Sequence, residues 1–438
     1  EKGRIMILSN AVILSVIILA ALCLAKVPVF FSLMISAICA GLISGTGISE
    51  TMKLLIGGMG NNAETALSYI LLGSLAFCMQ ETGAADIMAK KIGSLVKDNK
   101  ILLCIIIILI AIAAETIIPI HIAFIPILIP PLLSHMNKMK MNRKMLSVSF
   151  GFGLKAPYIA IPVGYGAIFQ GLIVDSFNRS GLSIVRKDVI TTNWIVAAIM
   201  FVGLVAGLIF FSRDRDYAEK EVEDSETREI PDKLEKRHIL VLLSGVITVL
   251  VQIFTESLPL GALVGLIFIV VTRVIKWDEI QKMLDGGINM MGFIAFVMLI
   301  AAGYANVLIK TGSVDALVQY ATSLLDGSKL VASYVMILLG LMITLGIGTS
   351  FGTVPIISAI YVPIAVSLGY SIPATILLVT IAAVCGDAGS PASDTTLGPT
   401  SGLSVDGQHD HIKDTCVPQF TFYGIPLILI GGFITTLI

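Results

Sequence analysis

Long apolar segments alternate with short polar ones along the whole chain, which is the pattern of a protein that crosses a membrane many times. In the first half the pattern predicts helices near 5–25, 28–45, 63–80 and 189–211, with a short amphipathic piece at 84–98. Apolar runs of this length match the thickness of a bilayer. The predicted fold class is therefore an all-α polytopic membrane protein.

Two apolar segments are too long for one crossing. An unbroken helix over 101–133 would exceed a hydrocarbon core of about 30 Å at about 1.5 Å per residue. We therefore predict a re-entrant hairpin there, with its tip at Ala113–Pro119, where a glutamate, a threonine and a proline interrupt the apolar run. A second hairpin is predicted at about 330–368, with its tip at Gly346–Pro355.

Two crossings are predicted to be broken by polar residues. The stretch Gly386–Asp406 follows an apolar run, yet it consists largely of Gly, Pro, Ser, Thr and Asp. Irregular backbone at membrane depth survives only where it is buried in protein or lines a wet cavity, and transporters use such breaks to bind ions and solutes. We predict broken helices over about 374–406 and over 145–177, the latter broken around Gly153–Pro157. The alternative is a long extramembrane loop after a short helix.

The two halves of the chain repeat each other. Residues 53–86 align without gaps to 282–315, at an offset of 229, with Gly-Gly and Thr-Gly-x-x-Asp in one register. Residues 171–175 also match 402–406, at an offset of 231. Apolar bias does not easily match glycine pairs and polar motifs together, so the match indicates a duplication.

The two copies are predicted to span 1–212 and 238–438, with the scaffold helices of the first copy within 5–80. Between them, 213–237 carries mixed charges and is expected to be a solvated linker. Each copy has five expected crossings, an odd number, so the second is predicted to be inverted relative to the first. The distribution of lysine and arginine places the linker in the cytoplasm and both termini outside.

Composition narrows the class of function. Of 438 residues, 56% are hydrophobic and only 13% charged, which excludes an ordinary soluble protein. A net charge of -1 gives no indication of a nucleic-acid partner, and the six cysteines show no spacing typical of a disulfide framework or a transition-metal site. We find no phosphate-binding motif or catalytic triad. The sequence therefore predicts a transporter rather than an enzyme, with no cofactor.

Oxygen ligands collect at the two predicted hairpin tips. Thr349, Ser350 and Thr353 offer neutral oxygens of the kind a Na⁺ site needs. The alternative is a helix kink whose hydroxyls bond to the preceding turn. At the first tip, Thr116 is the equivalent candidate, and Glu115 could pair with a base, bind a cation or reach water.

A lysine and an aspartate fall at nearly equivalent places in the two breaks. Lys155 and Asp387 are separated by 232 residues, close to the offset of the nearby motif. We predict that they form an ion pair within the membrane, because an unpaired charge there is expensive. The pair could only hold the two broken helices together. It could also act as a proton or sodium switch, or Lys155 could receive a substrate carboxylate.

Asp394 is the strongest single candidate for a cation ligand or a titrating carboxylate. It is followed by Thr395 and Thr396, so it could equally belong to a helix N-cap, and both roles can hold together. Pro157 and Ser390, which lie in the two breaks, complete the predicted substrate and ion site. The His409-x-His411 spacing is expected to have a surface or gating role rather than to bind metal.

The stretch Gly386–Leu403 together with Asp406–Pro418 resembles the signature of the NhaC-like Na⁺/H⁺ antiporter family, and most closely the branch regarded as amino-acid (histidine) permeases. The hairpins and broken helices also resemble the wider ion transporter superfamily, which includes dicarboxylate/sodium symporters. Those proteins carry Ser-Asn-Thr at the tips, whereas this chain has Ala114-Glu-Thr116 and Thr349-Ser-Phe351. The resemblance therefore implies the location of the site but not a dicarboxylate substrate. It further implies homodimers in which a transport domain moves against a scaffold.

The sequence and the resemblance together predict a transporter of the cytoplasmic membrane that takes up a small amino acid such as histidine, driven by Na⁺ or H⁺. Na⁺/H⁺ antiport, with Asp387 or Asp394 titrating, is the second hypothesis. A channel or a transporter-like receptor is the third, and a continuous polar pore would favour it.

Overall fold

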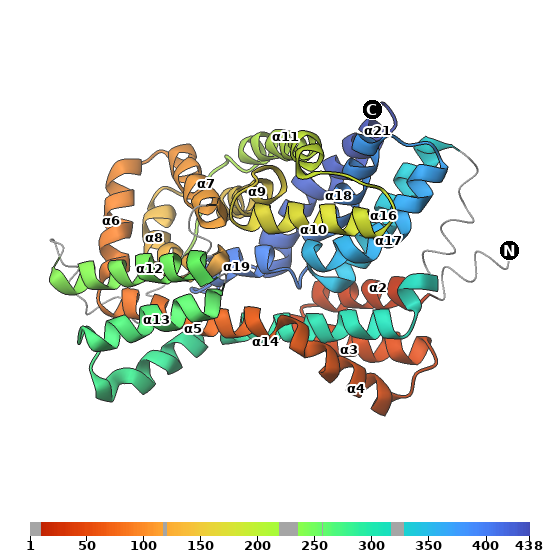
Figure 1. The fold of residues 1–438 in the computed structure, drawn as a ribbon. Helices are drawn as coiled ribbons and strands as arrows, with labels where there is room; N and C mark the ends of the chain where they lie inside the picture. Colours follow the sequence, from red (N-terminus) through yellow and green to blue (C-terminus); the bar gives the residue numbers. More distant parts are fainter. Residues whose placement is uncertain (1–9, 117–120, 219–234, 256, 317–327) are drawn as a thin grey trace.

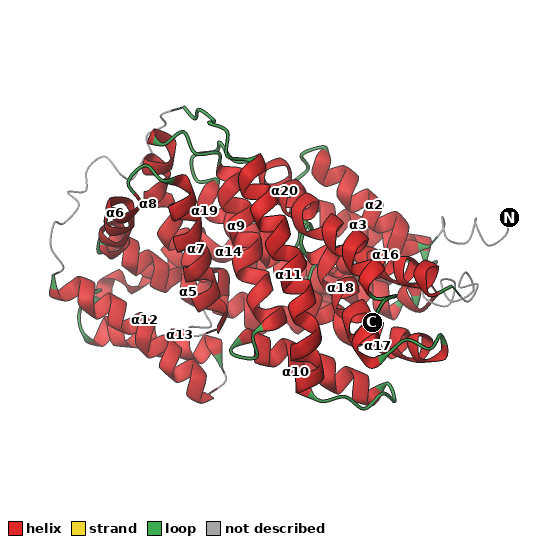
Figure 2. Ribbon diagram, turned by 90° about the horizontal axis from the view of Figure 1, so that it is seen from above, coloured by secondary structure: helices red, strands yellow, loops and turns green. Residues whose placement is uncertain are grey.

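The computed structural model describes residues 10–116, 121–218, 235–255, 257–316 and 328–438, and every regular element within these ranges is a helix (Figure 2). Six of these helices are long and apolar enough to cross a membrane, or seven if one bent pair counts as a single span. Four further apolar helices have between 10 and 17 residues. The chain is a multi-pass membrane protein.

The helices form two layers, one above the other in Figure 1. The lower layer, which we call the platform layer, is built around the long helix α14, which packs against α3, α4 and α5. Its helices are α2 (Ala11–Leu24), α3 (Val29–Ile43), α4 (Ile48–Met59), α5 (Ala63–Glu81), α12 (Lys236–Thr255), α13 (Leu258–Val271) and α14 (Ile280–Lys310), with the 3₁₀ turns η1 (Gly60–Asn62) and η3 (Trp277–Glu279).

The upper layer, which we call the site layer, contains both predicted hairpins and both predicted broken helices. Its first half comprises α6 (Ala84–Val96), α7 (Lys100–Thr116), η2 (His121–Phe124), α8 (Ile125–Lys138), α9 (Arg143–Ala160), α10 (Tyr165–Arg179) and α11 (Arg186–Phe210). Its second half comprises α16 (Lys329–Ile347), α17 (Ser350–Ser367), α18 (Ile372–Asp387), α19 (Asp394–Leu403) and a last helical segment formed by η4 (His411–Cys416), α20 (Val417–Gln419), η5 (Phe420–Gly424), η6 (Leu427–Gly431) and α21 (Gly432–Ile434).

Helix starts recur at one constant spacing. The starts of α3 and α13, of α4 and η3, of α7 and α16, of α9 and α18, and of α10 and α19 are at 29 and 258, 48 and 277, 100 and 329, 143 and 372, and 165 and 394. Each pair is 229 residues apart, the offset found in the sequence alignment. The offset of one short match thus extends over most of both halves.

The long elements of the platform layer touch through their backbones. A Cβ on Gly73 would lie 2.7 Å from the carbonyl oxygen of Gly287, and one on Gly58 would lie 2.9 Å from that of Ala302. Moving each residue of one contact to its counterpart 229 residues away gives the other contact. Since only glycine permits such an approach, the Gly-Gly motif that recurs in the two halves is explained by this crossing.

The first broken helix is interrupted at a different place from the one predicted. The sequence indicated a break around Gly153–Pro157, but α9 continues through these residues, and it is bent by 51° from α10 across residues 161–164. Ile161 is extended (φ −98°, ψ 120°) because it precedes Pro162, and a residue before proline avoids the helical region. Gly164 then has φ +61°, and a Cβ there would lie 2.4 Å from the carbonyl oxygen of Glu115.

The other predicted elements can be compared with the observed bounds. The second break covers residues 388–393, and the arms of the second hairpin, α16 and α17, are separated by Gly348 and Thr349. The first hairpin tip falls partly on residues 117–120, outside the described residues, as does most of the 213–237 linker. The separate helix α4, which precedes α5, was not predicted.

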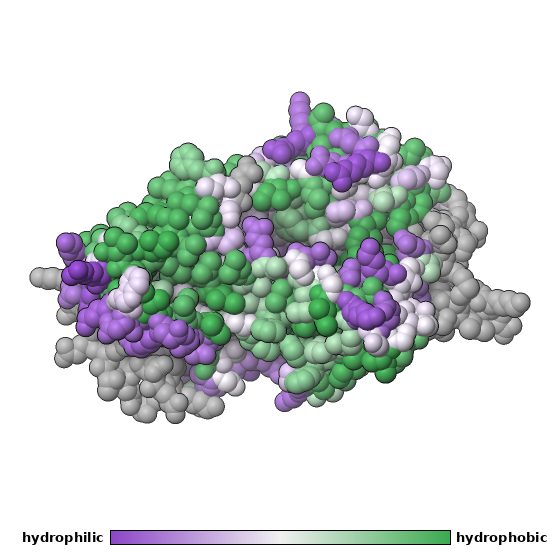
Figure 3. Space-filling view, turned by 60° about the horizontal axis from the view of Figure 1, so that its bottom comes forward, coloured by the Kyte–Doolittle hydropathy of each residue, from purple (hydrophilic) through white to green (hydrophobic). Residues whose placement is uncertain are grey.

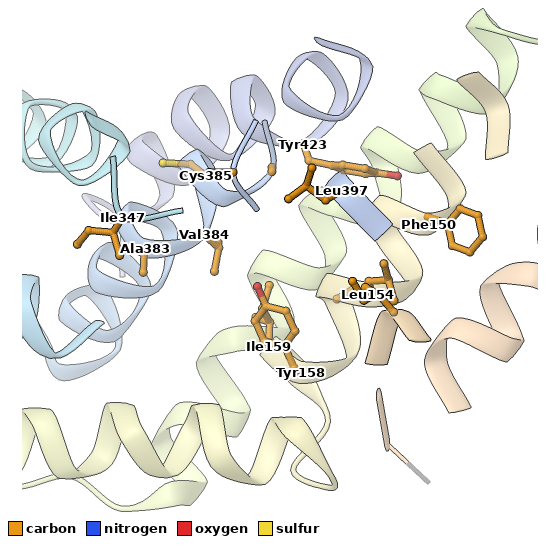
Figure 4. Packing of buried hydrophobic residues seen from close by; sticks show 14 of the residues in the cluster. Phe150, Leu154, Tyr158, Ile159, Ile347, Ala383, Val384, Cys385, Leu397 and Tyr423 are labelled. Atoms are coloured by element: carbon orange, nitrogen blue, oxygen red, sulfur yellow. The ribbon is translucent and has the colours of Figure 1, made fainter. Parts of the chain in front are cut away.

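The repeat-equivalent helices α9 and α18 occupy the centre of the site layer. All residues of α18 from Ala374 to Asp387 are buried, as are nearly all residues of α9. Figure 4 shows Leu154 and Tyr158 of α9 and Val384 of α18 in the same buried cluster. Much of the outer surface is hydrophobic, with hydrophilic side chains gathered in patches (Figure 3), as suits contact with lipid.

Candidate functional site

The candidate site forms where the break between α18 and α19 meets the end of α9 and the start of α17. Asp387 is the last residue of α18, and Ser393 caps α19 by accepting a hydrogen bond from the Thr395 backbone amide. The local sequence favours this geometry, because a serine or an aspartate next to a helix start satisfies amides that have no intrahelical partner. The break therefore presents side-chain hydroxyls beside a carboxylate.

Both carboxylate oxygens of Asp387 accept hydrogen bonds from neutral hydroxyls. The Tyr158 hydroxyl donates to Oδ2 at 3.1 Å, and the Ser393 hydroxyl donates to Oδ1. Tyr158 also lies 3.0 Å from the Ser350 hydroxyl at the start of α17. Asp387 is only 3% exposed, so these donors replace the water that an ionised carboxylate would otherwise need.

Lys155 is fully buried and reaches Asp387 only through hydroxyl groups. Its ammonium donates to Thr395 Oγ1 and, at 3.4 Å, to Gln419 Oε1. The Thr395 and Ser393 hydroxyls lie 2.8 Å apart, which completes the path to the carboxylate. We call the connected side chains, from the ammonium to the second hairpin, the hydroxyl chain: Lys155, Thr395, Ser393, Asp387, Tyr158 and Ser350.

The predicted Lys155–Asp387 ion pair is therefore wrong as a direct contact: among the described residues no ion-pair distance joins the two groups. The reason lies in the register. At the offset of 229, Asp387 is the counterpart of Tyr158, whereas Lys155 is the counterpart of Val384. Three residues of helix are about 4.5 Å along the axis, so the lysine lies nearly one turn away from the position opposite the aspartate.

Asp394 lies at the junction of the two layers. It is the first residue of α19 and partly exposed, and its Oδ2 accepts a hydrogen bond at 3.3 Å from Tyr69 of α5 in the platform layer. Glu115 is fully buried at the end of α7. Tyr165, the first residue of α10, has Glu115 and Asp394 among its charged neighbours. Two predicted acids, one from a hairpin arm and one from a break, thus approach the same tyrosine.

Several predicted hydroxyl residues bond to backbone instead of to the hydroxyl chain. The Thr116 hydroxyl donates to Ile112 O at 2.7 Å and the Thr353 hydroxyl to Thr349 O at 2.9 Å, which is the helix back-bonding weighed as the alternative. Thr396 donates to Ser390 O at 2.6 Å, and Ser390 Oγ lies 3.4 Å from Leu345 O. These residues shape the tips and the break.

Pro157 and Thr349 have backbone roles in the described structure. Pro157 lies inside α9 and accepts a hydrogen bond from the Ile161 amide through its carbonyl. Thr349 is the residue before α17 and makes no side-chain capping bond. Neither side chain belongs to the hydroxyl chain.

Sequence reasoning missed the tyrosines and the glutamine of the site. Tyr158 stands at the repeat-equivalent position of Asp387, so a register of 229 carried through both breaks would have found it. Gln419 donates to Ser147 O at 3.0 Å while it accepts from Lys155, and no motif marked it. Tyr69 comes from the other layer, and nothing in its own segment pointed to Asp394.

The two histidines of the His-x-His spacing are directed into the protein. His409 Nε2 lies 2.7 Å from Thr415 Oγ1, and His411 bonds Thr400 and the Pro391 carbonyl. Burial lowers the pKa of His409 to about 3, so it is neutral near pH 7. No group of three or more metal-ligating side chains occurs in the described part of the chain.

Comparison with known proteins places the chain among membrane transporters. A Na⁺/H⁺ antiporter family model matches residues 149–432, and a second Na⁺-H⁺ antiporter family model matches residues 10–96. The chain is 41% identical to the "Putative amino acid transporter YuiF" of Bacillus subtilis, over 96% of this chain and 98% of that protein. It is 40% identical to the "Uncharacterized membrane protein VP2115" of Vibrio parahaemolyticus, with the same coverage.

Among solved structures, the chain is similar to MtrF of Neisseria gonorrhoeae, which is described as representing a class of antimetabolite efflux pumps. The TM-score is 0.46 at 12% identity, over 88% of this chain and 83% of that chain.

Proposed function

The chain belongs to the Na⁺/H⁺ antiporter family, and from this premise we propose that it is a cation-coupled amino-acid permease of the cytoplasmic membrane. The observation that carries the proposal is the hydroxyl chain, in which a buried ammonium and a buried carboxylate are held apart by neutral groups at a helix break. Groups arranged in this way can exchange a proton, a cation or a charged solute by small rotations, whereas a direct ion pair must first be broken. The name of the Bacillus subtilis relative supports the amino-acid class.

Each charge of an amino acid has a counterpart in the proposed site. Lys155 and the amide end of α19 suit the substrate carboxylate. Asp394 is the carboxylate that we assign to the substrate ammonium or to the driving Na⁺ or H⁺, because it is partly exposed and lies where the layers meet. The hydroxyl of Ser350 adds a neutral oxygen for Na⁺.

The proposed mechanism is alternating access by an elevator movement of the site layer against the platform layer, within an inverted repeat. Three observations support it: the constant spacing of helix starts, the exchanged backbone contacts of α5 and α14, and the division into two layers. The homodimer, the external termini and the cytoplasmic linker are carried as expectations from the sequence and the family resemblance.

The test uses purified protein in proteoliposomes, with labelled histidine and an imposed Na⁺ or proton gradient. We expect accumulation that needs the cation gradient and that is lost in Asp394→Asn. Asp175→Asn, which changes an exposed carboxylate on α10, is the matched control and should retain uptake. Uptake that ignores both gradients, or that survives in Asp394→Asn, would contradict the proposal.

Na⁺/H⁺ antiport is the second candidate, favoured by the family to which the chain belongs. In the same vesicles, a pH-sensitive dye reports proton movement when Na⁺ alone is added. If amino acids stay out while Na⁺ drives proton efflux, the antiporter hypothesis replaces the permease hypothesis.

A further inference from the structure

We infer that Tyr158 is a positioning residue that transmits the cation occupancy of Asp387 to the hairpin of α16 and α17. The inference rests on the proposed function, because it assigns a role within the same cation-coupled site. It concerns a residue that carries no charge and that sequence motifs did not mark.

The first support is the place of Tyr158 in the repeat. Tyr158 and Asp387 are 229 residues apart, the same spacing that relates the starts of α9 and α18, and the two side chains touch each other. Repeat-equivalent residues can meet only near the axis that relates the two copies. Two carboxylates at this point would repel, and two tyrosines would offer no cation site. The pair of one acid and one hydroxyl donor resolves this conflict.

The second support is the position of the hydroxyl between two partners. Its oxygen lies 3.1 Å from Asp387 Oδ2 and 3.0 Å from Ser350 Oγ, so neither partner is favoured by distance. When Asp387 is ionised, the hydroxyl donates to the carboxylate and accepts from Ser350. When a proton or a cation neutralises Asp387, the hydroxyl is free to donate to Ser350 instead. The hydrogen-bond direction at the start of α17 therefore follows the occupancy of Asp387.

The third support is that the ring itself is held in place. The Tyr158 ring centroid lies 5.0 Å from that of Phe169 and 5.3 Å from that of Phe351, and those two lie 5.1 Å apart. Such aromatic contacts favour defined orientations. Tyr158 is only 2% exposed, so its hydroxyl can change hydrogen-bond direction while the ring stays fixed.

Other groups near Asp387 must be considered in any cation or pH titration. The charged neighbours are Lys155 of α9 and Asp394 of α19, and Cys385 of its own helix is a titratable neighbour. Since the tyrosine change leaves all three in place, a change of cation dependence in that variant reports on the hydroxyl.

The experiment compares Tyr158→Phe with Tyr423→Phe in purified protein. Tyr423 is also buried and donates to α9, at Val148 O, but it does not contact the hydroxyl chain. We measure Tm against Na⁺ concentration and against pH, together with the half-saturating cation concentration and Vmax of uptake in proteoliposomes. We expect Tyr158→Phe to change the half-saturating cation concentration at least tenfold with Vmax within threefold, and Tyr423→Phe to change neither.

Equal cation dependence in the two variants, within twofold, would overturn the inference. If Tyr158→Phe does not fold, Ser350→Ala removes the second partner of the hydroxyl and must give a change in the same direction, of at least threefold; no change would also overturn the inference. If wild-type protein takes up no amino acid, the proposed substrate class fails, while the titrations of Tm with Na⁺ and with pH still test Tyr158.

Discussion

Two buried pairs of opposite charges in this protein are built in opposite ways. Arg143 and Asp406 meet directly: Nη1 donates to Oδ1 at 2.7 Å and Nη2 to Oδ2 at 2.5 Å, and the Arg143 side chain is fully buried. Lys155 and Asp387 are also buried but are separated by the Ser393 and Thr395 hydroxyls. The first pair has fixed geometry, whereas the second can exchange partners.

The difference indicates which charges hold the protein together and which serve transport. A bidentate guanidinium–carboxylate pair fixes orientation, and removing one partner leaves the other charge buried without compensation. Arg143 also donates to Leu403 O at 2.8 Å, so it ties the start of α9 to the end of α19. We therefore regard the Arg143–Asp406 pair as a structural lock on the site layer and the hydroxyl chain as its working part.

The largest expected effect comes from opening this lock. Arg143→Met should destabilise the protein by about 3–5 kcal/mol, because it leaves Asp406 buried without its ionic partner. The loss of Tm in detergent measures the effect. Arg143→Met together with Asp406→Leu should recover part of it, since no uncompensated charge remains. A single variant as stable as wild type would show that the pair is not a lock.

A smaller loss from the same lock is expected on acidification. Burial alone would raise the pKa of Asp406, but hydrogen bonds from Arg143 and Gln408 outweigh burial and hold the pKa below its ordinary value. The stabilisation is therefore complete above the unfolded-state pKa of about 3.9 and is lost as pH falls through the lower folded-state pKa. Unfolding measured from pH 7 down to 3 should show this loss in wild type and not in Asp406→Asn.

Next in size is the cap of the second break. Ser393→Ala removes both the N-cap of α19 and one donor to Asp387, so a loss of about 1–2 kcal/mol is expected. Cation dependence of uptake should change as well, because the hydroxyl chain is interrupted. Ser401→Ala, which alters a partly exposed serine bonded to its own helix, is the control. If both variants behave alike in uptake, Ser393 is only a cap.

The smallest effect is expected at Thr116. Its hydroxyl bonds to its own helix, so Thr116→Val should change stability by less than about 1 kcal/mol and leave the cation dependence of uptake unaltered. Uptake assays at varied Na⁺ provide the check. A large change in cation affinity would place Thr116 in the working site and would extend that site to the first hairpin.

Much of the fold was predictable because it follows from local patterns. The length and polarity of each segment marked the membrane helices, and the apolar run into Gly386–Asp406 marked the second break. The first break was misplaced because two signals competed. Pro157 was taken as the interruption, but a proline can lie inside a helix that bends, whereas the extended residue before Pro162 and the left-handed Gly164 cannot continue it.

By itself, the sequence determined that the chain is a helical membrane protein with two related halves, and it identified most of the polar residues near the breaks. Those features depend on residue type and spacing along one segment. Only the tertiary structure decided which groups meet: that Tyr158 rather than Lys155 faces Asp387, and that Tyr69 reaches Asp394 from the other layer. The reason is that helix-to-helix contact depends on the relative register of segments far apart in the chain, where a shift of three residues, about 4.5 Å, exchanges an ion pair for a hydroxyl contact.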